Sequence, residues 1–104
     1  MQIQINTDSH IEGSLRLEAY VKSEIEEGLK RFSDQITRVE VHLSDVNGQK
    51  SGEDDKRCVI EARLKGIKPV VVTHQAKTID LALAGCTEKL KKSLDSTVGR
   101  HRKR

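Results

Sequence analysis

The residues with the clearest chemical potential are basic and lie at the C-terminal end of the chain. From residue 89 to residue 104 there are seven Lys or Arg and one acid, Asp95, a net charge of +6. The preceding 88 residues carry twelve basic and fifteen acidic side chains, a net charge of −3. Such a cluster indicates a contact for a polyanion, with nucleic acid the commonest candidate, and the alternative is a solvated end that only aids solubility.

Patterns typical of catalysis or of metal binding are absent from the sequence. Gly48 and Gly52 flank a short polar stretch, but the other residues of a phosphate-binding loop are missing. No nucleophile is placed beside a base, and Cys58 and Cys86 are expected to be buried thiols. The four histidines are too scattered for a metal site. We therefore expect no enzyme activity, no cofactor, no metal ion and no small-molecule substrate.

The length of the chain limits how the basic residues can be positioned. With 104 residues there is room for one domain with one core. No apolar run approaches the roughly 20 residues that a membrane helix needs. The start of the chain alternates polar and apolar residues and lacks the basic and apolar blocks of a signal peptide. A cytoplasmic protein without a membrane partner is therefore expected.

Two periodicities in the sequence predict the elements of the fold. Apolar residues at a three-and-four spacing predict one helix from the N-cap residue Ser14 to Phe32 and a second over residues 77–96. Gly99 is expected to end the second helix. A short turn is expected at 66–69. Alternating residues predict four strands, over 2–6, 38–44, 58–65 and 70–74.

The predicted order is β-α-β-β-β-α, which is an α+β fold. Packing both helices on one face of a four-stranded, mainly antiparallel sheet would bury every apolar stripe. Residues 1–98 are expected to form a single domain, and residues 99–104 a basic C-terminal tail.

Three stretches of the sequence resemble one known family. The opening Met1-Gln2-Ile3, the run from Phe32 to Ile36, and Gly85 followed by Glu88-Lys89-Leu90 are similar to the ribosome hibernation-promoting factor and ribosome-associated inhibitor family, also called sigma modulation proteins. The resemblance covers roughly residues 1–95. It implies a fold like that of a double-stranded-RNA-binding domain. It also implies a short-form factor that binds the small ribosomal subunit along the messenger channel, silences translation and stabilises inactive ribosomes under stress.

The same resemblance singles out basic residues of the second predicted helix. Lys89 and Lys92 match basic positions of the family and, being three residues apart, share a helical face, whereas Lys91 lies to its side. The sequence holds only two aromatic residues, so binding to ribosomal RNA is expected to depend on shape and phosphate contacts. The RNA-binding residues that we expect are Lys89, Lys91, Lys92, Arg100, Arg102, Lys103 and Arg104, together with Arg38, Arg63 and Lys65 on the outward face of the sheet.

An alternative function rests on where the chain departs from the family. Asp80 and Ala84 occupy positions where many members have Tyr and then Asp, and the first helix is more acidic than in several members. These departures favour a protein-interaction regulatory module that retains the fold without tight ribosome binding. A weak homodimer is also left open. A strong dependence of binding on salt and on the basic residues would favour the ribosome-binding hypothesis.

Overall fold

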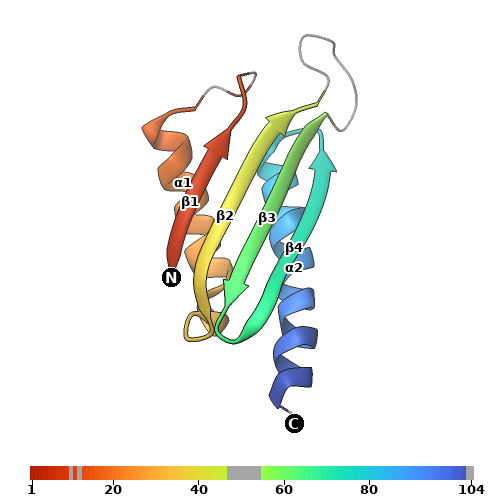
Figure 1. Cartoon of the computed structure of the whole chain (residues 1–104). Helices are drawn as coiled ribbons and strands as arrows, with labels where there is room; N and C mark the ends of the chain where they lie inside the picture. The colour runs from red at the N-terminus through yellow and green to blue at the C-terminus, as the bar shows by residue number, and fades with distance from the viewer. Residues whose placement is uncertain (10, 12, 47–54, 103–104) are drawn as a thin grey trace.

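All segments with alternating residues form strands of one sheet, and both amphipathic segments form helices on one of its faces (Figure 1). The computed structural model describes residues 1–9, 11, 13–46 and 55–102. The α+β fold and the order of its elements are confirmed. Along the chain these are β1 (Gln2–Thr7), α1 (Leu15–Gly28), the 3-10 helix η1 (Lys30–Phe32), β2 (Ile36–Asp45), β3 (Lys56–Leu64), β4 (Ile67–Ala76) and α2 (Ile79–Arg102).

The four strands lie in the order β1-β2-β3-β4. β1 and β2 are parallel because α1 crosses over between them, whereas β2, β3 and β4 form antiparallel hairpins. The register aligns Ile5 with Val41 and Val41 with Ile60, so apolar side chains gather on the face that the helices cover. The opposite face of the sheet is mostly polar, although Val71 is exposed on it, and neither helix covers it (Figure 1).

The core lies between the sheet and the two helices. Val21 and Ile25 of α1 and Leu90 and Leu94 of α2 are completely buried. Cys58 and Cys86 are buried free thiols, as predicted, and the Cys86 Sγ lies 3.3 Å from the carbonyl oxygen of Cys58. A hydrogen bond that the Cys58 thiol donates to Cys86, together with burial, raises the pKa of Cys58, which therefore stays protonated and packs as a small apolar group.

The first helix begins as predicted but ends earlier. Ser14 is its N-cap, with the Ser14 Oγ accepting a hydrogen bond of 3.0 Å from the amide of Leu17. The helix ends at Gly28 rather than at Phe32, and η1 follows it. At this end α1 packs so closely on α2 that a Cβ at Gly28 would lie 2.8 Å from the Thr87 Cγ2. This contact between helices, which is not visible in the periodicity, accompanies the change from α to 3-10 geometry.

The last strand begins earlier than predicted. β4 starts at Ile67, because Gly66 makes a tight turn with a positive φ of 68° that other residues rarely adopt. Pro69 therefore lies within the strand and not in a turn. Its missing amide hydrogen is tolerated because β4 is an edge strand and the pairing with β3 shifts register here, between Ala62 and Leu64.

The second helix is longer than predicted. It continues to Arg102, so the stop expected at Gly99 is wrong and the predicted tail begins inside the helix. Val98 is buried and extends the apolar stripe by another turn, and cations near a helix C-terminus are favoured by the dipole. Lys103, Arg104, Gly48 and Gly52 lie outside the described residues. Among the helices of the described ranges, none is long and apolar enough to cross a membrane.

Candidate nucleic-acid interface

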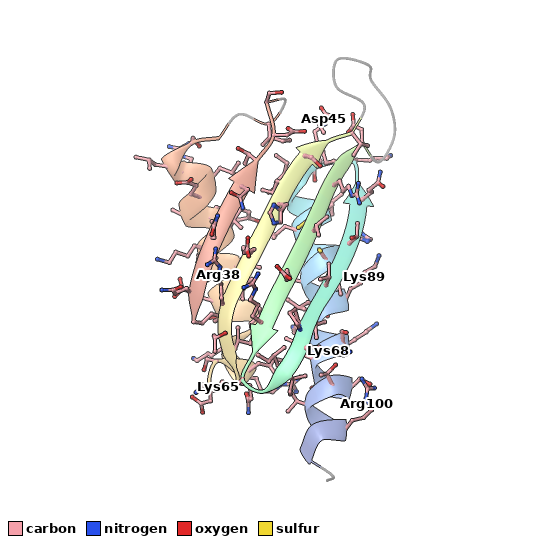
Figure 2. The ribbon with its side chains drawn as sticks, in the orientation of Figure 1. Arg38, Asp45, Lys65, Lys68, Lys89 and Arg100 are labelled. Atoms are coloured by element: carbon pink, nitrogen blue, oxygen red, sulfur yellow. The ribbon has the colours of Figure 1, made fainter. Side chains whose placement is uncertain are left out.

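Basic side chains follow one side of α2 and the adjoining strand β4. Figure 2 shows Lys68, Lys89 and Arg100 along this side of the molecule and Lys65 at the turn between β3 and β4. Lys92 lies about one helical turn after Lys89 in α2 and is exposed. We call this surface the basic edge; it consists of Lys65, Lys68, Lys89, Lys92 and Arg100.

A close approach of α2 to β4 positions the basic edge. Gly85 faces the imidazole of His74, and a Cβ at residue 85 would overlap that ring. Because Gly85 has no side chain, α2 can pack against the strand at this point. One turn later the Lys89 Nζ donates a hydrogen bond of 2.8 Å to the carbonyl oxygen of Thr73 in β4. This bond holds the ammonium group at the seam between helix and strand.

The remaining cations of the basic edge extend into solvent. Arg100 donates a hydrogen bond of 2.8 Å to the Ser96 Oγ, one turn earlier in α2. Lys65, Lys68 and Lys92 are exposed, and no carboxylate in the described part of the chain forms an ion pair with them. Their charges are therefore available to a polyanion such as the phosphate backbone of a nucleic acid.

Lys91 belongs to a different surface, as its position in the helix predicts. Its Nζ lies 3.1 Å from the Glu88 Oε1, and it lines a groove of about 230 Å³ between α1 and α2. Burial and the nearby carboxylates of Asp80 and Glu24 raise the pKa of Tyr20 in this groove. We call it the acidic groove; its polar lining residues are Tyr20, Glu24, Glu27, Asp80, Thr87, Glu88 and Lys91.

The two arginines predicted on the outward face of the sheet are engaged in ion pairs. Arg38 Nε lies 3.6 Å from the Glu40 Oε2, and a terminal nitrogen of Arg63 lies 3.7 Å from the same oxygen. Arg63 also lies 3.8 Å from Glu61. Glu40 and Glu61 are directly opposite each other in the β2–β3 pairing, where two like charges are unfavourable. Arg38 and Arg63 therefore compensate these carboxylates and add no net charge to the open face.

Two basic residues that the sequence did not single out contribute to the charge distribution. Lys68 was missed because it falls in a segment predicted to be a turn, next to Pro69. Arg31 in η1 forms an ion pair of 2.6 Å with Asp95 and lies 4.6 Å above the ring of Phe32. Asp95 is the single acid of the basic C-terminal segment, and this pair neutralises it.

Of the other predicted residues, Arg102 is the last residue of α2. The structure thus places Lys65, Lys89 and Arg100 along one side of the molecule, whereas Lys91 lines the acidic groove and Arg38 and Arg63 pair with Glu40 on the open face. Nowhere in the described ranges do three or more His, Cys, Asp or Glu side chains gather to form a potential metal site.

The sequence and the fold of this chain are both similar to those of known proteins. The family model described as sigma 54 modulation protein / S30EA ribosomal protein matches residues 3–102. No curated protein matches the sequence. Among solved structures, the chain is similar to the N-terminal domain of Protein Y from Thermus thermophilus, with 19% identity, a TM-score of 0.73 and coverage of 92% of this chain and 98% of that one. A ribosomal subunit interface protein from Coxiella burnetii aligns with 16% identity, a TM-score of 0.69 and coverage of 92% and 96%.

Proposed function

The chain belongs to the sigma 54 modulation protein / S30EA ribosomal protein family, and from this premise we propose that it binds the small ribosomal subunit through the basic edge and silences translation under stress. The resemblance found in the sequence is thereby confirmed at the level of the family, whose members are ribosome-associated and not known as enzymes. The cytoplasm is the compartment in which this function would be exercised.

The observation that carries the proposal is the arrangement of the basic edge. Lys65 comes from the turn before β4, Lys68 from β4, and Lys89, Lys92 and Arg100 from α2. The four of these residues that Figure 2 labels, Lys65, Lys68, Lys89 and Arg100, follow one side of the molecule. Ribosomal RNA presents closely spaced phosphates, and each cation that neutralises a phosphate releases condensed counterions. Affinity is then set by electrostatics and falls steeply with salt.

The aromatic residues support a mode of binding without base recognition. Phe32 is buried in the core, and Tyr20 lines the acidic groove, where carboxylates would repel phosphates. Neither ring is available as a platform on which unpaired bases could stack. The chain would recognise the shape of folded RNA and its phosphates, and it would silence translation by occupying the space of messenger and transfer RNA.

Sedimentation with purified ribosomal particles tests this function. We expect the protein to pellet with small subunits and with whole ribosomes at low salt, to be released as salt rises, and to be displaced by messenger RNA. In a cell-free translation reaction, protein added before the messenger should reduce synthesis. Binding to large subunits only, or no pelleting at low salt, would contradict the proposal.

The acidic groove favours a second candidate function. A groove lined by Glu24, Glu27, Asp80 and Glu88 is suited to a basic protein segment and not to RNA. The chain would then act as a protein-interaction module that retains the fold without tight ribosome binding. Pelleting that depends on the groove carboxylates and not on the basic edge would favour this candidate.

A further inference from the structure

The two edge strands of the sheet differ in how they are protected against pairing with another strand. β4 carries Lys68 and Pro69 and is irregular at that point, which are the features that discourage edge-to-edge pairing. β1 has neither charge nor proline, and its pairing with β2 runs from Gln2 to Thr7 without a shift in register. Its outer side thus offers a regular row of backbone donors and acceptors.

An apolar depression adjoins this edge, between β1 and α1. It has a volume of about 430 Å³ and includes Ile3, Ile5, Leu15 and Ala19. Ile3 and Ile5 are only partly buried, and Leu15 is 85% exposed. A strand added beside β1 would place alternate side chains in this depression and cover all three of these residues.

The rim of the depression carries two opposite charges, Glu18 and Lys22, one turn apart on α1. Lys22 also lines the surface next to Gln2 and Gln4, so it lies beside the N-terminal half of β1. Figure 1 shows that α1 begins near the C-terminal end of β1 and runs back alongside it. Leu15 and Glu18 belong to the first turn of α1, which is therefore the turn nearest that end.

We propose that two copies of this chain pair through antiparallel β1 strands related by a two-fold axis. The axis reverses one β1 against the other, so Lys22 of each copy faces Glu18 of the second copy, and each exposed Leu15 is covered. The arrangement is isologous, since the same surface is used twice. Its charges are self-complementary, and this favours a second copy over an unrelated strand. The basic edge remains uncovered, because β1 and β4 are opposite edges of the sheet.

Analytical ultracentrifugation of the full chain at low salt, over a concentration series, tests this pairing without any ribosome. We expect a reversible monomer–dimer equilibrium. Lys22→Glu and Glu18→Lys should each weaken the homodimer by roughly ten-fold or more, because like charges then meet at both symmetry-related contacts. An equimolar mixture of the two variants should dimerise again, since every contact then joins opposite charges. Circular dichroism of each variant checks that α1 still folds.

Three results would overturn the proposal: a wild-type chain that stays monomeric at every concentration, a dimer that tolerates both reversals, or variants that do not rescue each other. If the wild-type chain stays monomeric, the β1 edge would remain open for pairing with a strand from another protein. None of these results depends on ribosome binding, so the dimer and the proposed function can fail separately.

Discussion

Two sides of one helix differ in charge although they are built from the same few turns of sequence. Lys89 lies on the side of α2 that adjoins β4, where it bonds to Thr73, and Lys92 follows it by three residues on the exposed surface of the helix. Glu88 and Lys91 lie on the side that adjoins α1, where the acidic groove holds three more carboxylates. The net charge of a segment therefore does not identify a binding surface. The helical phase of each charge, and the element it packs against, decide which side can approach RNA.

The opposite charges of the basic edge and the acidic groove would also affect how the protein is oriented when it approaches RNA. A polyanion attracts the basic edge and repels the acidic groove, so the field of the RNA would orient the protein before contact. The open face of the sheet contributes little, because Arg38 and Arg63 are compensated by Glu40 and Glu61. We therefore expect the cations of the basic edge to favour one orientation of the protein on RNA.

Neutralising the basic edge should have the largest effect on the affinity for small ribosomal subunits. Replacing Lys65, Lys68, Lys89, Lys92 and Arg100 by Gln should weaken binding to small subunits by roughly 100-fold or more at about 0.1 M salt, because each substitution removes a phosphate contact. Fluorescence anisotropy with labelled protein gives the dissociation constants. The matched control replaces Arg38 and Arg63, together with Glu40 and Glu61, by Gln. An equal loss in the control would remove the distinction between the two surfaces.

The basic edge can also be disturbed without changing any charge. Gly85→Ala adds a methyl group where the ring of His74 lies, and overpacking of this kind exceeds the helix-propensity gain of about 1 kcal/mol. We expect a net loss of about 1–2 kcal/mol in the free energy of unfolding, measured with urea.

Gly99→Ala in the same helix is the control for this substitution. A Cβ at residue 99 would meet no atom within 4 Å, so the exchange should stabilise the protein by up to ~1 kcal/mol. The double variant Gly85→Ala with His74→Ala should recover part of the loss. If Gly85→Ala is as stable as Gly99→Ala, the close packing of α2 on β4 is not what positions Lys89.

Neutralising the acidic groove should have the smallest effect on the affinity for small ribosomal subunits. With Glu24, Glu27 and Glu88 replaced by Gln, we expect the affinity for small subunits to change within about two-fold, in the direction of tighter binding. The groove lies across a helix whose width of about 10 Å is close to the Debye length at 0.1 M salt, so its repulsion of phosphates is largely screened. A loss of binding in this variant would instead support the protein-interaction function.

The fold was predictable because each element has a clear periodicity. Alternation placed the strands, and the apolar stripes of α1 and α2 placed the helices on one face. The end of α1 at Gly28, the start of β4 at Ile67 and the continuation of α2 past Gly99 were not predicted from periodicity. The early end of α1 accompanies a contact with Thr87. The start of β4 depends on the tolerance of an edge strand for Pro69, and the extension of α2 follows from burial of Val98. All three depend on contacts between segments distant in sequence.

The candidate site was predictable only in part, for a related reason. Helical spacing set Lys91 apart from Lys89, in agreement with the ion pair between Lys91 and Glu88. The compensation of Arg38 and Arg63 depends on strand register, which aligns Glu40 with Glu61 across two strands. Lys68 joined the basic edge only once β4 was known to begin at Ile67, and the ion pair between Arg31 and Asp95 joins residues 64 positions apart.

The most direct test of the account compares two adjacent lysines of α2. Lys91→Gln and Lys92→Gln remove the same charge from consecutive residues, and the dependence of small-subunit affinity on salt is measured for each variant and for the wild type. We predict that Lys92→Gln lowers the slope of log K against log salt by about 1, and that Lys91→Gln leaves it unchanged. Equal slopes for the two variants, or a larger change for Lys91→Gln, would contradict the assignment of RNA binding to the basic edge.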